Sequence, residues 1–143
     1  MAHTTKTAHQ LIDIHVHGAE KYDTQTRRQD DVLQVARIHG DHGTDAMLPT
    51  VYPGSLDDMR ANMDAVRRAM EAQKSGAAIL GVHLEGPFLH PDRAGSLNRK
   101  RFLDPSVKKL GELIDGYEDL IRIITIAPEL PGALKVIEKC RAR

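Results

Sequence analysis

The sequence predicts an α/β fold built on a parallel sheet. Short apolar segments rich in strand-forming residues alternate four times with segments of helical periodicity, and this alternation is typical of parallel strands joined by right-handed crossovers. Two architectures fit, an open doubly wound sheet and part of a (β/α)8 barrel. The chain has 143 residues, whereas a complete barrel needs roughly 250. No Gly-x-Gly-x-x-Gly follows the first strand, which removes the main support for a dinucleotide-binding open sheet.

Four segments are predicted to form the strands, in sequential order: residues 11–17, 44–50, 78–85 and 120–127. In the first, apolar residues (Ile12, Ile14 and Val16) alternate with polar ones, so the polar side chains share one face. These are Asp13, His15 and His17. Pro49 and Gly86-Pro87 are expected to end the second and third strands, because proline cannot donate to a ladder. The fourth is nearly continuous in apolar residues, as expected for a strand covered on both faces.

Helical periodicity fills the intervals between these strands. The first helix is predicted over about residues 30–41, and the second opens at Ser55, the first residue of a capping box. The third is expected to begin with Asp104 as its N-cap and Pro105 at the first helical position. The last follows Pro131 and is expected to turn three residues inward: Leu134, Ile137 and Cys140.

Composition narrows the classes of partner. Lys+Arg and Asp+Glu number 20 each, so no charge imbalance indicates nucleic acid or a membrane surface. No apolar run approaches the 18 or so residues of a membrane span. The single Cys140 excludes an intrachain disulfide and fits a reducing compartment. We therefore expect a cytoplasmic protein, with residues 1–10 as a flexible polar lead-in and residues 11–143 as one domain.

Three residues are candidates for a metal site. His15 and His17 lie two apart on one strand, and Glu85 ends the third strand, at the sheet edge where both architectures place ligands. A carboxylate at the tip of an apolar strand is costly to bury unless it is paired or binds a metal. Imidazole and carboxylate together suit zinc or another transition metal. Alternating surface histidines explain His-x-His alone more often, and with Glu85 the two interpretations balance.

Other polar residues near these strand ends are interpreted separately from the three candidate ligands. His83 shares the face of Glu85 and is interpreted as orienting a metal ligand from behind, the alternative being a packed histidine. Asp13 lies deeper, where a structural role is favoured. Glu129 follows the fourth strand and either orients loops or caps a helix. Several histidines have no partner in the sequence and are interpreted as ordinary surface or packed residues: His3, His9, His39, His42 and His90.

Four motifs together resemble one family. Ile-Asp-Ile-His-Val-His-Gly, Gly-Thr-Asp-Ala-Met-Leu-Pro-Thr, Gly-Val-His-Leu-Glu-Gly-Pro-Phe-Leu and Ile-Thr-Ile-Ala-Pro-Glu-Leu look like the N-acetylglucosamine-6-phosphate deacetylases, metal-dependent amidohydrolases with (β/α)8 barrels. The resemblance runs from Leu11 to Arg143 and implies about four βα units, the amino-terminal half of the barrel. By this similarity Glu85 corresponds to the metal-binding glutamate. His15 and His17 match paired histidines that supply a second metal position in some members.

The departures from the family pattern are equally informative. Members normally carry a small β-domain built partly from residues before the first strand, where this chain has a mostly polar segment of ten residues. The remaining metal histidines and the catalytic aspartate of the family come from later strands, so the general base is unknown here. Leu97 stands where some members have a substrate-contacting histidine, and its neighbours Ser96 and Asn98 are the candidate substrate contacts.

The resemblance implies hydrolysis of N-acetylglucosamine 6-phosphate to glucosamine 6-phosphate and acetate, in amino-sugar catabolism. It also implies a divalent metal, zinc first, with iron or another transition metal as alternatives. We expect the 143-residue chain alone to be inactive. Catalytic groups that act as a unit are strongly non-additive, so loss of the general base together with several metal ligands should remove nearly all turnover. The alternative is a non-catalytic half-barrel. In either case we expect the unpaired strand edges of the half-barrel to recruit a second copy or a complementary fragment.

Overall fold

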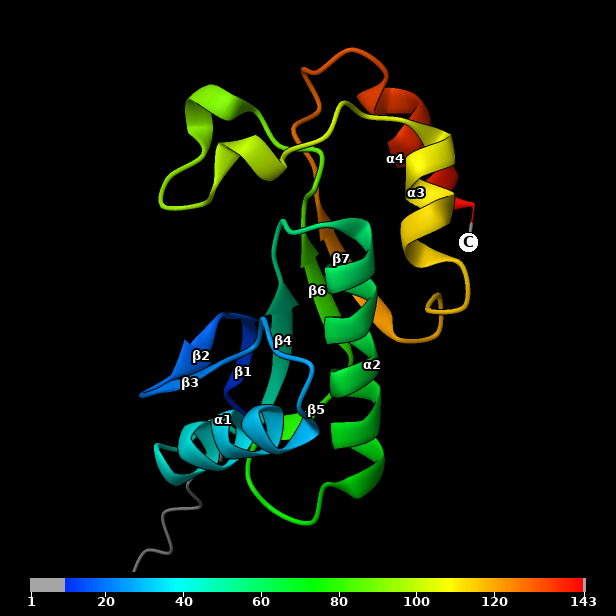
Figure 1. The fold of residues 1–143 in the computed structure, drawn as a ribbon. Coiled ribbons are helices and arrows are strands. Elements are labelled where there is room, and N and C mark those ends of the chain that lie inside the picture. Colours follow the sequence, from blue (N-terminus) through cyan, green and yellow to red (C-terminus); the bar gives the residue numbers. More distant parts are fainter. Residues whose placement is uncertain (1–9, 143) are drawn as a thin grey trace, which may run out of the picture.

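The structure is a computed structural model that describes residues 10–142. The expected lead-in over residues 1–10, with His3 and His9, lies outside the described residues except for Gln10. Figure 1 shows a sheet with helices alongside it and a long loop at one end. None of the described helices is long and apolar enough to cross a membrane.

The predicted parallel sheet is confirmed. Its four main strands are hydrogen-bonded in sequential order: β1 (Ile12–Val16), β4 (Ala46–Val51), β6 (Val82–Glu85) and β7 (Ile121–Thr125). Every pair in this series is parallel. A short strand, β5 (Ala78–Ile79), also pairs with β4 in parallel. The carboxyl ends of the strands therefore meet at one end of the sheet, as Figure 1 shows.

Four helices follow the strands: α1 (Gln29–Asp41), α2 (Leu56–Ala72), α3 (Val107–Ile114) and α4 (Ala133–Arg141). Each helix contacts the next along the chain, as neighbouring outer helices of a barrel do. The core lies between helices and sheet, where Met59 and Met63 of α2 and Leu84 of β6 are fully buried. The predicted cap of α2 is confirmed, because Ser55 Oγ accepts a hydrogen bond from Asp58 N at 3.1 Å.

Three strand predictions need correction. Pro49 lies inside β4 and does not end it. The ladder tolerates this proline because the β1–β4 register shifts nearby and Val16 N donates to Thr50 Oγ1 at 2.9 Å. The third strand is split between Ile79 and Val82, where Gly81 has φ +141°. The fourth is only half-buried along its length, because β7 is one of the two outer strands of the described sheet.

Two helix starts also differ from expectation. The N-cap of α3 is Ser106, whose Oγ accepts from Lys109 N at 3.4 Å, and Asp104 lies outside the helix. Helix α4 begins after Gly132, which has φ +87°. Its buried positions are Ala133 and Val136. Leu134, one residue from Ala133 and therefore about 100° around the helix, is 67% exposed.

The first strand has an exposed apolar face and an unpredicted hairpin after it. Ile12 and Ile14 are 47% and 52% exposed, while Val16 is buried. They are exposed because β1 is an outer strand that, among the described elements, contacts mainly β4, and no described helix packs closely over it. The hairpin consists of β2 (Gly18–Ala19) and β3 (Tyr22–Asp23). Because it follows β1 directly, it lies next to the candidate metal ligands.

Candidate metal centre

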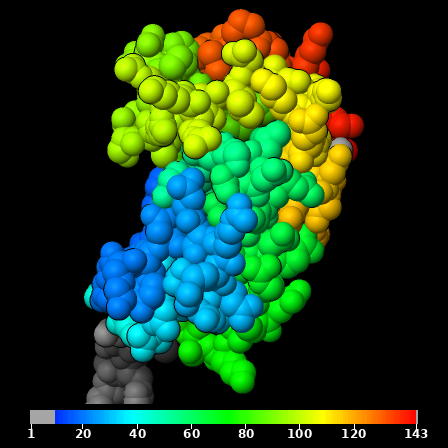
Figure 2. All heavy atoms as spheres, in the orientation of Figure 1, coloured from blue at the N-terminus to red at the C-terminus, as the bar shows by residue number. Residues whose placement is uncertain are grey.

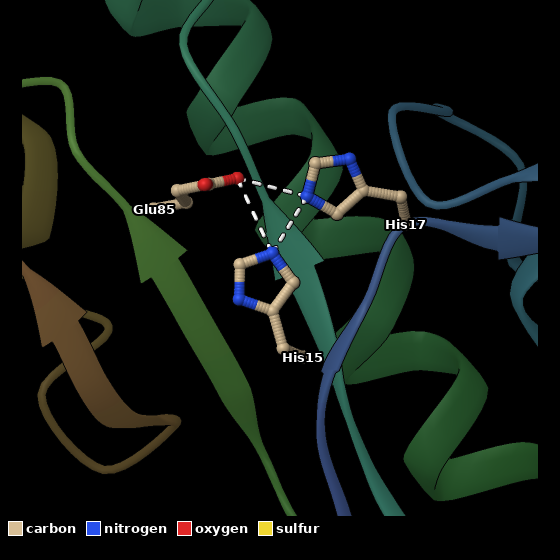
Figure 3. A group of neighbouring side chains, drawn as sticks. All are labelled: His15, His17 and Glu85. Carbon is tan, nitrogen blue, oxygen red and sulfur yellow. Dashed lines mark hydrogen bonds and ion pairs between the residues drawn. The ribbon is translucent and has the colours of Figure 1, made fainter. Parts of the chain in front are cut away.

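His15, His17 and Glu85 converge at the carboxyl end of the sheet. His15 lies in β1, His17 directly follows it and Glu85 is the last residue of β6. Figure 3 shows the three side chains pointing toward one another. His17 Nε2 lies 3.0 Å from His15 Nε2 and 2.8 Å from Glu85 Oε2, and His15 Nε2 lies 3.5 Å from Glu85 Oε2. We call these three atoms the triangle. The predicted convergence is therefore present.

The donor set fits a transition metal ion. Two imidazole nitrogens and one carboxylate oxygen, with a position left open, form the ligand set typical of a catalytic zinc site. Ligand atoms about 2.0–2.1 Å from a tetrahedral ion are about 3.3 Å apart. The observed separations of 2.8, 3.0 and 3.5 Å bracket that value. The side chains of His15 and His17 are 46% and 38% exposed, whereas that of Glu85 is 17% exposed.

Hydrogen bonds alone satisfy this triangle poorly. Each ring nitrogen has one in-plane direction, occupied by a proton or by a lone pair. His17 Nε2 makes short contacts to both His15 and Glu85 but carries at most one proton, so it can form a good hydrogen bond with only one of them. A cation held by His15, His17 and Glu85 would instead accept a lone pair from each of the three atoms. The geometry thus suits a metal better than a proton.

His83 lies behind this triangle. Its Nδ1 is 2.8 Å from the carbonyl oxygen of Ile14, and its Nε2 is 2.8 Å from Thr125 Oγ1. The carbonyl can only accept, so Nδ1 carries the proton and Nε2 accepts from the hydroxyl. Burial lowers the pKa of His83 below its ordinary value, which favours this neutral form. The ring also meets His15 edge-on, with centroids 4.9 Å apart, so it contacts a candidate ligand without joining the triangle.

The ring of His17 contacts a ring that the sequence did not indicate, that of Tyr52. Tyr52 stacks on the His17 ring, with centroids 4.5 Å apart and planes at 6°. The ring of His15 is also nearly parallel to it, at 11° and 5.0 Å, and approaches it through the two Nε2 atoms. Tyr52 follows β4 directly, and its hydroxyl lies 2.9 and 3.0 Å from the carboxylate oxygens of Asp23. Burial, reinforced by this carboxylate, raises the pKa of Tyr52 to about 12.

Thr24 holds the backbone at the same place. Its side chain is fully buried, and its Oγ1 lies 3.0 Å from the carbonyl oxygen of His17 and 2.7 Å from that of Thr50. Its backbone N–H also donates to the His17 carbonyl, at 2.9 Å. The hairpin after β1 therefore ties the His17 backbone to β4.

Comparison with known proteins identifies the relatives of this chain. The chain is 34% identical over 122 residues to N-acetylglucosamine-6-phosphate deacetylase of Bacillus subtilis, covering 83% of this chain and 31% of that protein. It is 29% identical over 126 residues to N-acetylgalactosamine-6-phosphate deacetylase of Escherichia coli O157:H7, covering 88% and 33%. The chain is homologous to part of the N-acetylglucosamine-6-phosphate deacetylases. No protein-family model matches.

Solved deacetylase structures agree with this homology. A mutant N-acetyl-D-glucosamine-6-phosphate deacetylase of Mycobacterium smegmatis, in complex with N-acetyl-D-glucosamine-6-phosphate, superposes with a TM-score of 0.80 at 28% identity. The match covers 90% of this chain and 32% of that one. The chain thus spans about a third of the length of the relatives it matches. Its sheet and helices represent four successive units of the deacetylase (β/α)8 barrel.

A cavity of about 630 Å³ adjoins the candidate centre of this deacetylase homologue. His17 and Tyr52 contribute to its wall, and the long loop after β6 supplies Ser96, Leu97 and Asn98. In Figure 2 this loop, coloured yellow-green, overhangs the blue segment that precedes α1. The two candidate substrate contacts, Ser96 and Asn98, therefore share a cavity with His17. Their contact with a substrate remains a prediction.

The other polar candidates lie outside the triangle. Asp13 Oδ1 accepts from His15 N at 3.0 Å, which supports its structural interpretation. Glu129 lines a separate cavity with His90. His39 Nε2 lies 3.5 Å from the carbonyl oxygen of Gly18, and His42 Nδ1 lies 2.8 Å from that of Ile38. None of these five residues joins the three converging donors.

Proposed function

We propose that this chain carries the metal-binding part of an amidohydrolase that deacetylates N-acetylglucosamine 6-phosphate. The observation that carries the proposal is the convergence of His15, His17 and Glu85 in a chain homologous to the deacetylases over most of its length. The reaction hydrolyses the acetamide to glucosamine 6-phosphate and acetate.

His15, His17 and Glu85 would hold the metal, with zinc favoured by the mixed nitrogen and oxygen donors. A bound ion supplies Lewis acidity, which polarises a carbonyl and acidifies water. Glu85 is the least exposed of the three side chains, so its charge acts in a poorly solvated environment. His83 contacts His15 from behind and limits the rotation of its ring. The general base is not assigned to any residue of this chain.

The cavity beside His17 is the proposed sugar site. Ser96 and Asn98 offer a hydroxyl and an amide to the sugar oxygens, and Leu97 offers an apolar contact between them. The wall also carries Arg27 and Arg101, although Arg27 is paired with Asp58 at 2.7 Å. A polar, partly cationic wall suits a phosphorylated sugar.

Calorimetric titration with Zn²⁺ tests the metal site. The wild-type chain should bind zinc weakly, because the shell contains only three ligands from this chain. Glu85→Gln keeps the shape of the side chain but removes its charge, so we expect binding to weaken by at least about tenfold. Glu129→Gln, at the separate cavity, is the matched control and should bind like wild type. Equal zinc affinity of wild type and Glu85→Gln would show that Glu85 is not a zinc ligand.

The alternative, a half-barrel that assembles without turnover, is favoured by one observation. Ile12 and Ile14 of the outer strand β1 are about half exposed, and an unpaired apolar edge recruits other strands. Sedimentation velocity over a concentration series distinguishes the two proposals. Two results together would favour assembly over catalysis. The wild-type chain would self-associate while Ile14→Lys would not, and the wild-type chain would show no measurable zinc binding.

A further inference from the structure

The ring of His17 is not oriented by a hydrogen bond from its second nitrogen to a protein group among the described residues. A metal-bound histidine normally donates its second ring nitrogen to a carboxylate, carbonyl or water, which fixes the plane of the ring. Within residues 10–142 the structure gives His17 Nδ1 no hydrogen-bond partner. A residue of this chain that fixes the plane of the ring must therefore act in another way.

Stacking on Tyr52 provides that orientation. The two rings are nearly parallel, at 6°, with centroids 4.5 Å apart, which is the geometry of a favourable offset stack. Rotation of His17 about its ring bond would break this contact. It would also turn Nε2 away from Glu85, 2.8 Å away.

Tyr52 is itself held in place from the hairpin. Its hydroxyl lies within 3.0 Å of both carboxylate oxygens of Asp23. Asp23 Oδ1 in turn accepts from Gln25 N at 2.6 Å. The ring of Tyr52 is therefore fixed at its hydroxyl by Asp23 and at its base by the end of β4.

We propose that Tyr52, anchored by Asp23, is a positioning residue that sets the plane of the His17 ring and thereby the metal affinity of the cluster. The inference rests on the proposed metal site. It adds a residue that contacts a ligand only through its aromatic face. Residues that orient metal ligands by hydrogen bonds commonly change metal affinity by about 10–100-fold when they are replaced, and we expect an effect at the lower end of this range for a stacked ring.

Titration of the full chain with Co²⁺, followed by its visible absorption, tests this inference. Tyr52→Leu removes the aromatic face and should weaken Co²⁺ binding by about tenfold or more. Tyr52→Phe keeps the stack and should stay within about threefold of wild type. Asp23→Ala removes the same hydroxyl anchor, so the double variant Asp23→Ala/Tyr52→Phe should match either single variant. Tyr52→Gln repeats the test with a polar replacement if Tyr52→Leu does not fold.

Tyr117→Phe is the matched control. Tyr117 also donates to a carboxylate, Asp64 Oδ1 at 2.8 Å, but it lies beside α3, away from the triangle. This variant should bind Co²⁺ like wild type. Unchanged affinity in folded Tyr52→Leu or Tyr52→Gln would overturn the positioning role while leaving the metal site intact. Absence of Co²⁺ binding by wild type would overturn both.

Discussion

His83 Nε2 lies 2.8 Å from the hydroxyl of Thr125, and the other nitrogen of the ring reaches the backbone of Ile14. These partners belong to β7 and β1, the two outer strands of the described sheet. One buried imidazole on β6 therefore links both outer strands. The interaction spans the sheet at the level just below the candidate metal ligands.

Replacing this imidazole should destabilise the fold. His83→Leu leaves the Ile14 carbonyl and the Thr125 hydroxyl without their partner, so we expect unfolding free energy to fall by about 1–3 kcal/mol. Urea unfolding measures the change. His42→Leu, at an exposed histidine, should cost under about 0.5 kcal/mol. Equal stability of both variants would show that the bridge contributes little.

Gly76 should be far less tolerant of a side chain than Gly43. Both have positive φ, +86° and +92°, so alanine strains either position by about 1–2 kcal/mol. A Cβ on Gly76 would also lie 2.7 Å from the Ala36 carbonyl oxygen in α1, whereas nothing lies within 4 Å at Gly43. We expect Gly76→Ala to cost about 2–4 kcal/mol. Thermal unfolding of the two variants checks the difference, and similar costs would contradict the close backbone approach.

Tyr117 should make stability fall at alkaline pH. Burial, reinforced by Asp64, raises the pKa of the Tyr117 phenol above 10.0. The unfolded chain therefore loses this proton first, and folding stability declines as pH rises from about 10 toward the folded-state pKa. Tyr117→Phe should flatten the decline in urea unfolding measured across this range. An identical pH profile for the variant would show that Tyr117 titrates alike in both states.

Deacetylase activity should be negligible in the 143-residue chain. Catalytic groups that act as a unit are strongly non-additive, so a metal site without an assigned base should turn over little substrate. The measurement is release of glucosamine 6-phosphate with added Zn²⁺. A full-length deacetylase relative is the positive control. Robust metal-dependent turnover by the chain alone would show that this chain completes the active site itself.

The strand order and the metal triangle could be predicted because each depends on simple spacing. Residues two apart on a strand share a face, which correctly brought His15 and His17 together. The carboxyl ends of parallel strands lie at the same edge of the sheet. This rule correctly placed Glu85 near the two histidines, although its strand, β6, is not adjacent to β1. Burial was harder to predict, because Ile12 and Ile14 have the apolar pattern of core residues but lie on an outer strand.

The surroundings of His17 could not be predicted in this way. The strands of the hairpin that carries Asp23 have two residues each, too few for any periodicity. Tyr52 contacts His17 across 35 positions of sequence through ring stacking, for which the sequence has no spacing signal. Its place directly after a strand was the one available indication. The buried face of α4 was also mispredicted. It is shifted by one residue from the expected one, so that Ala133 and Val136 are buried and Leu134 is exposed.

The triangle joins residues that are far apart in the chain. Glu85 and His17 are separated by 68 positions, and their strands, β6 and β1, have β4 between them. A cation held there would act as a reversible crosslink that closes a long loop, so its binding energy would also oppose unfolding. A chelator would then loosen the fold, and proteolytic lifetime would depend on the supply of metal.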